Sequence, residues 1–178
     1  MSTNLTPDIN DHDNIQGSPE AIITLVEYGD YLCPHCGHAY PIVKQLQQEF
    51  GDQLKVIFRN FPLRKIHPLA SPAAVAAEAA AQQGKFWEMH DLIFENQANL
   101  QKSSFAILAE QIGLNMTQFN RDIEDPQMTQ KVDLDFESGI MSGVNGTPTF
   151  FVNGTRYNGS WEAEELAIFF NTLINNKS

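Results

Sequence analysis

The sequence predicts an α/β domain in which helices flank a central mixed β-sheet and an all-helical subdomain interrupts the chain. A strand, a helix and a second strand follow one another over residues 21–61, and only helical patterns occupy residues 68–143. A β-hairpin and a closing helix then take up residues 148–174. Strands joined through a helix run parallel with a right-handed crossover, whereas hairpin strands run antiparallel. The predicted sheet is therefore mixed.

The first strong strand covers residues 21–28, whose nearly continuous apolar run is typical of a strand covered on both faces. The preceding residues 1–14 are polar and acidic, and we expect them to form a flexible segment. Gly17-Ser18-Pro19 indicates a loop before the strand. The folded domain is therefore expected to begin near residue 15.

The only two cysteines, Cys33 and Cys36, lie directly after this strand. Pro34 suits the first position of a helix, which places Cys33 at the helix N-terminus and Cys36 one turn along. Unpaired backbone N–H groups and the helix dipole favour negative charge at that end, so the Cys33 thiolate should be stabilised. The thiolate is the form that attacks disulfides. The pattern predicts a dithiol–disulfide redox site.

The same short stretch allows two other interpretations. Cys33, His35, Cys36 and His38 could be metal ligands, although structural zinc sites usually draw a second ligand pair from a distant segment and the chain has no further cysteine. Buried cysteines can also pack as small hydrophobic residues. The polar His35 between the cysteines argues for an exposed site instead.

Glu27 interrupts the apolar strand six residues before Cys33. A carboxylate beneath a dithiol can relay protons to and from the inner cysteine, with its pKa raised by burial. A glutamate facing solvent is the alternative. We predict that Glu27 belongs to the redox site.

The helix that starts at Pro34 carries apolar residues at helical spacing and should end at Gly51. A second strand over residues 54–61 follows and stops at Pro62. Five helices with short connections should form a compact subdomain. They are expected at residues 71–84, 85–96, 104–112, 117–124 and 126–142. His67 and His90 flank or occupy this region, and we expect them to serve packing or hydrogen bonding.

The hairpin strands are expected at residues 148–153 and 155–157, because Asn153-Gly154 is the strongest short hairpin signal. Ser160 should cap the closing helix at residues 161–174. Pro148 precedes the first of these strands, and the sequence pattern by itself does not distinguish a cis from a trans bond there.

Composition limits the class of protein. The chain has 178 residues, of which 42% are hydrophobic and 19% charged, as in globular proteins. The formal net charge of -11 argues against a nucleic-acid partner, because phosphate binding needs clustered Lys and Arg. No apolar run approaches the roughly 20 residues of a membrane span. The start of the sequence lacks the apolar core of a secretory signal, so we expect a cytoplasmic protein as written, or a periplasmic one if a signal peptide was removed before Met1.

Cys33-Pro34-His35-Cys36 after the strand, together with Gly146-Thr147-Pro148 before the hairpin, resembles the DsbA-like thiol:disulfide oxidoreductase family of the thioredoxin superfamily. The resemblance implies a thioredoxin fold built from residues 15–67 and 144–178, with residues 68–143 as the inserted helical subdomain. It also implies an N-terminal strand within residues 15–20.

For the site, the resemblance implies that Pro148 is cis and lies against the cysteines, and that Glu27 is the buried acid. Gly146, Thr147 and Pro148 would bind substrate, with the Thr147 backbone pairing to a substrate strand.

The predicted activity is thiol–disulfide exchange, with the direction left open. Cys33 is the exposed nucleophile, Cys36 resolves the mixed disulfide, and a charged His35 stabilises the Cys33 thiolate. The redox-active disulfide takes the place of a cofactor. Protein or peptide thiols and disulfides are the expected partners, with a redox partner or small thiol to recycle the pair. A non-catalytic peptide-binding module and a Cys/His metal-binding protein are the alternatives.

Overall fold

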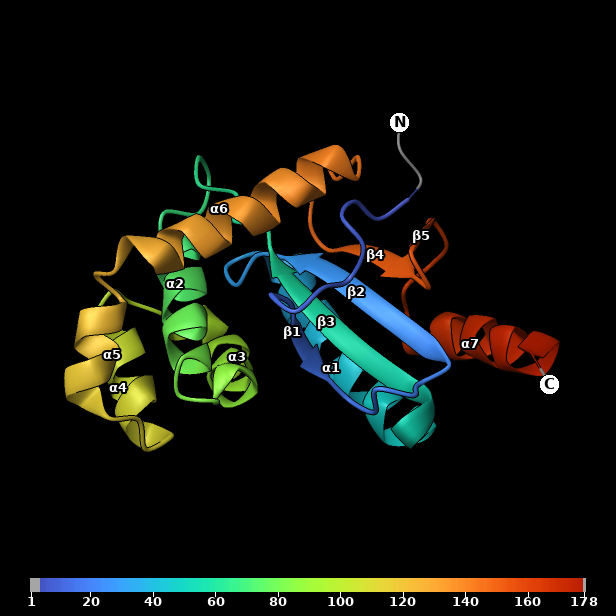
Figure 1. The fold of residues 1–178 in the computed structure, drawn as a ribbon, viewed down its shortest axis with the longest axis horizontal. Coiled ribbons are helices and arrows are strands. Elements are labelled where there is room, and N and C mark those ends of the chain that lie inside the picture. Colours follow the sequence, from blue (N-terminus) through green and yellow to red (C-terminus); the bar gives the residue numbers. More distant parts are fainter. Residues whose placement is uncertain (1–3, 178) are drawn as a thin grey trace.

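The computed structural model describes residues 4–177 and contains a five-stranded mixed sheet in the order β1-β3-β2-β4-β5 (Figure 1). Strands β2 and β3 run parallel, and the other neighbouring pairs run antiparallel. The strands are β1 Asn14–Gln16, β2 Ile23–Gly29, β3 Leu54–Asn60, β4 Thr149–Val152 and β5 Thr155–Tyr157. The predicted α/β class and the mixed sheet are confirmed.

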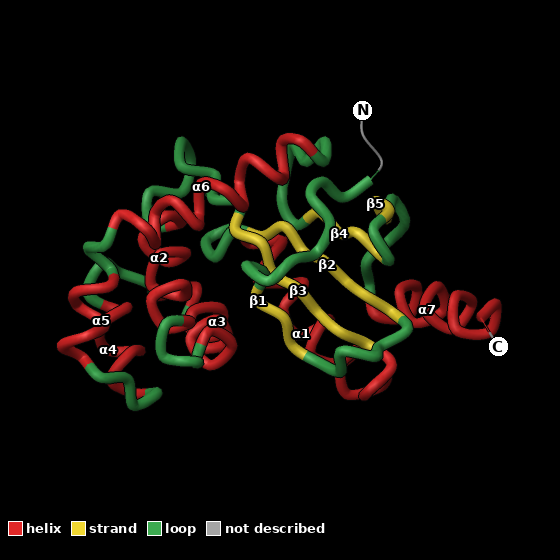
Figure 2. The backbone as a smooth tube through the Cα atoms, in the orientation of Figure 1, coloured by secondary structure: helices red, strands yellow, loops and turns green. Residues whose placement is uncertain are grey.

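An all-helical insertion separates β3 from β4, as predicted. Figure 2 shows the strands gathered in one part of the molecule and helices α2 to α5 in another. The helices are α1 Pro34–Phe50, α2 Ala70–Ala81, α3 Phe86–Glu95, α4 Ser104–Gln111, α5 Met116–Asp122, α6 Pro126–Met141 and α7 Ala163–Lys177. Two short 3-10 helices, η1 Gly51–Gln53 and η2 Gln97–Asn99, follow α1 and α3.

Both faces of the sheet are covered, which explains the nearly continuous apolar sequence of β2. Leu25 faces a core shared with α1 and α7, whereas Val26 faces a second core shared with the N-terminal segment. Helix α6 closes this second face, and it approaches closely at Gly139. A Cβ atom there would meet the Phe61 ring at 2.6 Å, so this contact requires glycine.

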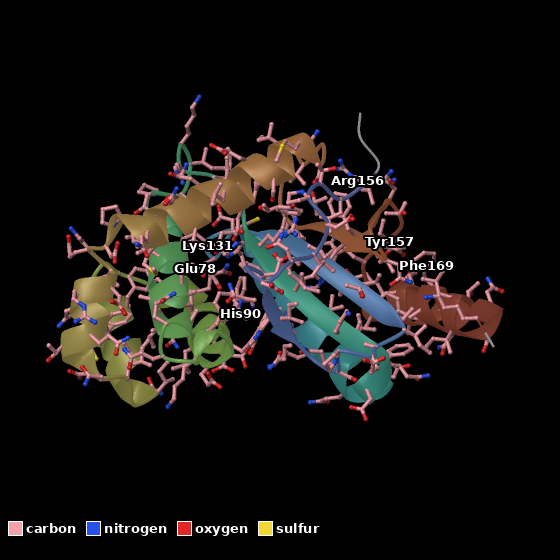
Figure 3. All side chains as sticks on the ribbon, viewed as in Figure 1. Glu78, His90, Lys131, Arg156, Tyr157 and Phe169 are labelled. Carbon is pink, nitrogen blue, oxygen red and sulfur yellow. The ribbon has the colours of Figure 1, made fainter. Side chains whose placement is uncertain are left out.

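A buried polar cluster joins the helical insertion to the sheet. Lys131 on α6 lies 2.6 Å from Asp135 and 3.6 Å from Glu78 on α2, and the Asn60 amide at the end of β3 donates to both carboxylates. Glu78 and Lys131 are labelled in Figure 3. These bonds fix the insertion against the sheet next to the cysteine turn.

The turn between β4 and β5 follows the sequence prediction. Asn153 has φ 50° and Gly154 has φ 81°. Two successive positive φ values are what a two-residue type I′ hairpin turn requires.

Three expectations are corrected. Strand β1 covers Asn14–Gln16 rather than a stretch within residues 15–20. Residues 4–13, expected to be flexible, pack against the sheet through buried Leu5 and an Asp13–Arg59 ion pair; residues 1–3 lie outside the described part. Helix α7 begins at Ala163, so Ser160 is not its N-cap, and its hydroxyl accepts from the Glu162 N–H at 3.3 Å.

Candidate active site

The cysteine turn connects the end of β2 to the start of α1. The Cys33 N–H donates to the Asp30 carbonyl at 3.1 Å, and the Gly37 N–H donates to the Cys33 carbonyl at 3.0 Å. Pro34 occupies the first turn of α1, and Cys33 is the N-cap residue. The predicted placement of both cysteines on the helix N-terminus is confirmed.

Both cysteines carry free thiols, and their surroundings differ. Cys36 is fully buried, whereas Cys33 keeps 5% of its surface exposed. Cys33 is therefore less exposed than predicted, but it is the more exposed of the two cysteines.

The Cys33 thiolate is strongly stabilised. A hydrogen bond from the Cys36 thiol, opposed by burial, and further bonds from the Thr147 side chain and the backbone N–H groups of Cys36 and His35 lower the Cys33 pKa to about 5. The Thr147 hydroxyl is buried without good hydrogen-bond geometry to any described residue. We therefore assign the stabilisation chiefly to the Cys36 thiol and the helix N–H groups.

The pKa of Cys36 is shifted in the opposite direction. Burial, the hydrogen bond to Cys33 and the charge of Glu27 raise the pKa of Cys36 well above its ordinary value. One backbone N–H, that of Asp30, donates to its sulfur at 3.5 Å. The Cys33 sulfur is thus the more stable thiolate, and the more deeply buried Cys36 sulfur is held as a protonated thiol.

Glu27 is buried, as the family resemblance implies, and it interacts electrostatically with both cysteines. Glu27 is 4% exposed, and its register partners on the neighbouring strands are Phe58 of β3 and Phe150 of β4. Burial first, and then the charge of Cys33, raise the Glu27 pKa to about 8. Glu27 is consequently a carboxyl group that can give or take a proton near neutral pH.

The chain before β4 completes the site. The Thr147–Pro148 peptide bond is cis, as the resemblance implied, and the Cys33 Sγ lies 3.5 Å from the Thr147 carbonyl oxygen. The Thr149 hydroxyl donates to the Gly146 carbonyl at 2.7 Å, which fixes the turn. Gly146, Thr147 and Pro148 therefore lie beside Cys33.

The two histidines of the motif have different surroundings. His35 is exposed, and its backbone N–H is the part shown to act on Cys33. The His38 Nε2 lies 3.0 Å from the carboxylate of Glu162, the residue directly before α7. Within residues 4–177, no three His, Cys, Asp or Glu side chains converge as metal ligands.

Asp30 is a site residue that the sequence interpretation missed. Its buried carboxylate accepts from the N–H groups of Leu32 at 2.7 Å and Leu63 at 2.9 Å, and it pairs with His67 at 2.8 Å. Asp30 thereby holds the cysteine turn against the loop after β3. His67 has a structural role in this contact.

Gln97 is the second missed residue. Its amide donates to the carbonyls of Tyr31 at 2.8 Å and Cys33 at 2.9 Å, which ties the helical insertion to the cysteine turn. A Cβ atom at Gly37 would lie 2.2 Å from the Gln97 side-chain oxygen, so glycine makes room for this contact. His90 is buried, and burial together with the Lys44 charge lowers its pKa to about 3.

Most of this chain is similar in sequence to known proteins. A family model described as thioredoxin matches residues 10–171. A Na(+)/H(+) antiporter, NhaA 1 of Salinispora arenicola, is 42% identical over 157 residues, which are 88% of this chain and 24% of the relative. The chain thus spans about a quarter of the length of such curated relatives.

Solved structures share the fold. A thioredoxin-like oxidoreductase from Silicibacter pomeroyi has a TM-score of 0.79 at 27% identity over 95% of both chains. Alpha-DsbA1 from Wolbachia pipientis has a TM-score of 0.83 at 20% identity over 94% of both chains. None of the helices within residues 4–177 is long and apolar enough to cross a membrane.

Proposed function

This chain belongs to the thioredoxin family, and on that premise we propose that it is a DsbA-like thiol-disulfide oxidoreductase whose Cys33–Cys36 pair donates a disulfide to protein thiols. The opposite pKa shifts of the two cysteines support this proposal. Cys33 has a pKa lowered to about 5, and the Cys36 pKa is raised. A stable Cys33 thiolate stabilises the reduced pair, and a pair with a stable reduced form is a strong oxidant.

The proposed exchange has two steps. A substrate thiolate attacks the Cys33 sulfur of the disulfide, and Cys36 leaves as a thiolate that takes a proton from Glu27. A second substrate thiolate then attacks the substrate sulfur of the mixed disulfide and releases the Cys33 thiolate. Substrate is oxidised to a disulfide and the pair is reduced to one thiolate and one thiol. The low pKa of Cys33 makes it a good leaving group in the second step.

The chain before β4 is the proposed substrate surface. Gly146, Thr147 and Pro148 lie beside the Cys33 sulfur, where an extended peptide could pair with the Thr147 backbone. Main-chain pairing is tolerant of sequence, which suits an enzyme that acts on many protein thiols. A disulfide donor works in an oxidising compartment, because cytosolic glutathione keeps such pairs reduced.

The equilibrium between this pair and glutathione tests the proposed direction. We expect a reduction potential of about -120 to -180 mV, the range of disulfide donors. Thiol labelling in buffers of defined glutathione ratio would measure it. A value near about -250 mV or below would instead make the protein a reductase. Failure of the two cysteines to form a disulfide would reject the redox function.

His35→Ser should raise the Cys33 pKa above the wild-type value of about 5 and make the pair less oxidising. His35 is an exposed residue in the first turn of α1, where a positive charge on its ring would favour the thiolate, and the serine keeps the backbone N–H. Each pKa unit corresponds to about 1.4 kcal/mol, or about 30 mV for this two-electron couple. Titration of thiolate absorbance gives the midpoint directly.

The matched control is His38→Ser, because His38 is an exposed histidine of the same helix that contacts Glu162 instead of the thiolate. Its midpoint should stay at the wild-type value. If the His35→Ser midpoint and potential also stay there, the His35 ring has no part in stabilising the thiolate.

A further inference from the structure

The chain contains three Asn-Gly dipeptides, Asn145-Gly146, Asn153-Gly154 and Asn158-Gly159. This dipeptide favours a specific reaction, in which the backbone nitrogen after an asparagine attacks the carbon of the side-chain amide. Glycine hinders that attack least, because it has no Cβ atom and a freely adjustable backbone. The reaction converts the asparagine to aspartate or isoaspartate. The three dipeptides differ in their hydrogen bonds and in their position relative to Cys33.

Asn145-Gly146 lies in the connection between α6 and β4 (Figure 1). Asn145 is exposed, and neither its side chain nor the Gly146 N–H has a hydrogen-bond partner among residues 4–177. A Cβ atom at Gly146 would meet no atom within 4 Å beyond its chain neighbours. The attacking nitrogen and the side-chain amide are therefore free to approach each other.

Asn153-Gly154 is held in place by the hairpin. The Thr24 N–H donates to the Asn153 side-chain oxygen at 2.8 Å, and the Asn153 N–H donates to the Thr24 carbonyl at 2.9 Å. Both residues of the turn have positive φ, 50° and 81°. Attack by the Gly154 nitrogen would have to break the bond that fixes the Asn153 amide to β2. We expect this dipeptide to react slowly.

Asn158-Gly159 follows β5 and is also exposed. The Tyr157 hydroxyl donates to the Ser160 carbonyl at 2.7 Å, which closes this loop. A Cβ atom at Gly159 would lie 2.6 Å from the Tyr157 hydroxyl oxygen, so the tyrosine covers the glycine. We expect a rate between those of the other two dipeptides. No hydrogen bond joins this loop to Cys33 among the described residues.

Asn145 is the asparagine of the three that stands next to the active site. The Thr147 carbonyl oxygen lies 3.5 Å from the Cys33 Sγ, and the Thr149 hydroxyl donates to the Gly146 carbonyl at 2.7 Å. Successive Cα atoms are about 3.8 Å apart, so the Asn145 Cα lies at most about 8 Å from the Thr147 Cα. A change in the main chain at Asn145 therefore reaches the segment beside the Cys33 sulfur.

We propose that Asn145 is a site of spontaneous deamidation, and that the isoaspartate formed there displaces the chain beside Cys33 and slows disulfide exchange. The chemical change at Asn145 is independent of the proposed function. Its effect on exchange rests on that function.

The reaction needs only water and hydroxide. Hydroxide removes the proton of the Gly146 N–H, and the nitrogen attacks the Asn145 Cγ. A C–N bond forms and closes a succinimide ring, while the C–N bond of the side-chain amide breaks and ammonia leaves with a proton from water. Water then opens the ring. Cleavage of the new C–N bond gives aspartate, whereas cleavage of the original peptide C–N bond gives isoaspartate. No atom is oxidised or reduced.

The two products should differ in their effect. Aspartate adds a negative charge, which disfavours the Cys33 thiolate, but salt screens exposed charges beyond about 8 Å at physiological ionic strength. Isoaspartate adds one atom to the main chain directly before Gly146 and Thr147, which form the proposed substrate surface. Isoaspartate should therefore cause the larger loss of exchange rate.

A simpler interpretation is that Asn145 is an exposed loop residue without influence on the site. It predicts that deamidation at Asn145 and at Asn158 is equally harmless. The exchange rate of aged protein separates the two interpretations.

The test ages the reduced full chain at pH 6 and at pH 8.5 in the presence of a reductant. Peptide mapping by mass spectrometry measures the conversion of each asparagine, and chromatography resolves isoaspartate from aspartate. We expect Asn145 to convert several-fold faster than Asn153, with Asn158 between them, and all conversion to be faster at pH 8.5. After reoxidation, the rate at which the protein oxidises a reduced peptide should fall in proportion to the isoaspartate at Asn145.

Asn145→Gln should keep its initial exchange rate throughout ageing, because the longer side chain disfavours ring closure. The matched control is Asn158→Gln, which should lose rate as the wild type does. Asn145→Asp should show only a small loss, which added salt removes.

Gly146→Ala tests the chemistry at the attacking nitrogen. The open space around Gly146 accepts a Cβ atom, and its φ lies outside the left-handed region. The added methyl group should slow the conversion of Asn145 several-fold, measured by peptide mapping alone.

Three results would overturn one statement each. Conversion of Asn145 no faster than that of Asn153 would reject the deamidation site. Full conversion of Asn145 to isoaspartate with an unchanged exchange rate would reject its effect on the active site. If fresh wild type does not exchange disulfides, the proposed function fails, and peptide mapping still decides whether Asn145 is the modified residue.

Discussion

Cys33→Ser should reduce the oxidation of a reduced peptide to the rate of buffer alone. The serine hydroxyl cannot form a disulfide, and the remaining cysteine, Cys36, is fully buried with a raised pKa. A serine suits the N-cap position of α1, so the fold should persist. The loss should therefore be complete and should come without loss of thermal stability, measured by circular dichroism.

Cys36→Ser should have a different effect. Reduced Cys33 in this variant still attacks a peptide disulfide, because the serine hydroxyl replaces the Cys36 thiol as a hydrogen-bond donor and the backbone N–H groups at positions 35 and 36 remain. The resolving sulfur is absent, so the mixed disulfide should accumulate. Mass spectrometry would show it as an adduct on Cys33 that a reductant removes. The two variants together assign one role to each cysteine.

A non-catalytic peptide-binding module would keep its function in the Cys33→Ser variant. Such a module would act through the surface at Thr147 and Pro148, and its affinity and cellular task would survive Cys33→Ser. Fluorescence anisotropy with a peptide that lacks cysteine measures that affinity. Full function of Cys33→Ser would contradict the exchange mechanism, whatever the affinity.

Local signals predicted the elements that carry the chemistry. The apolar run of β2, the proline at the start of α1 and the Asn153-Gly154 turn each determine the local structure through neighbouring residues. Such signals can be recognised in the sequence alone. The positions of Cys33 and Glu27 followed from these elements. The cis bond at Pro148 came from the family resemblance, because the local pattern allowed both isomers.

The missed site residues depend on contacts between distant segments. Gln97 reaches the Tyr31 carbonyl across 66 residues of sequence, and polar residues in short connections give no sign of such a partner. Asp30 offered one signal, an acid in the turn directly before a cysteine pair. Its role becomes visible only when the loop with Leu63 and His67 folds against that turn.

The predicted flexibility of the N-terminal segment is wrong because the segment, too, is ordered by contacts with residues distant in the sequence. Residues 4–13 are polar in sequence, which is typical of a flexible end. Their order comes from Arg59, which lies 46 residues after Asp13 in the chain and is almost fully buried on β3. A charged residue inside an apolar strand was the available indication that a charged partner had to cover it.

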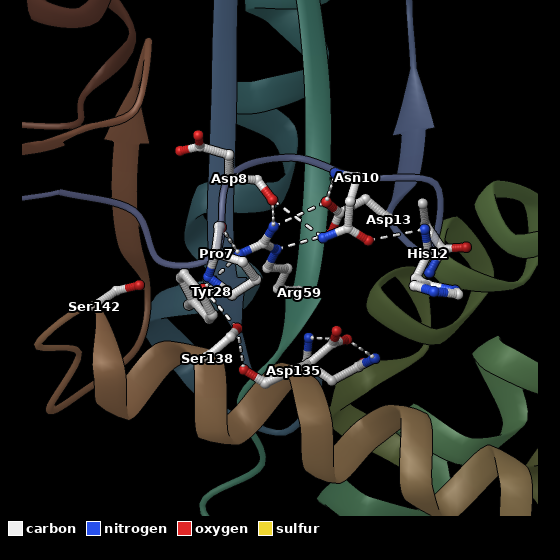
Figure 4. Close-up of polar contacts among 12 residues, drawn as sticks. Pro7, Asp8, Asn10, His12, Asp13, Tyr28, Arg59, Asp135, Ser138 and Ser142 are labelled. Atoms are coloured by element: carbon white, nitrogen blue, oxygen red, sulfur yellow. Dashed lines mark hydrogen bonds and ion pairs between the residues drawn. The ribbon is translucent and has the colours of Figure 1, made fainter.

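Arg59→Leu should destabilise the protein by about 3–5 kcal/mol, because it leaves the charge of Asp13 buried without a partner. Figure 4 shows the contacts. Arg59 donates to the two Asp13 oxygens at 2.8 and 2.9 Å, to the carbonyls of Pro7 and Asp8, and to the Tyr28 hydroxyl. The Arg59 and Asp13 side chains are 2% and 4% exposed. Burial alone would lower the Arg59 pKa, but these hydrogen bonds outweigh it and raise the pKa.

Urea unfolding of the reduced protein measures the loss, and Arg64→Leu is the matched control. Arg64 pairs with Asp133, and both side chains are 45% exposed. An exposed pair of this kind contributes about 0–1 kcal/mol, so the control should unfold close to the wild type. Equal effects of Arg59→Leu and Arg64→Leu would show that the N-terminal segment does not depend on the buried pair.

Two further variants distinguish the buried charge from lost packing. Arg59→Lys keeps the positive charge but loses the planar pair of bonds to Asp13, so its destabilisation should fall between the wild type and Arg59→Leu. Adding Asp13→Leu to Arg59→Leu removes the uncompensated carboxylate and should restore part of the stability. If the double variant is as unstable as the sum of the single variants, the charge of Asp13 is not the cause. The N-terminal segment would then be held by the buried Leu5 side chain, by the bond from the Leu5 N–H to the Gly154 carbonyl, and by the bridge between Asn4 and Thr155 of β5.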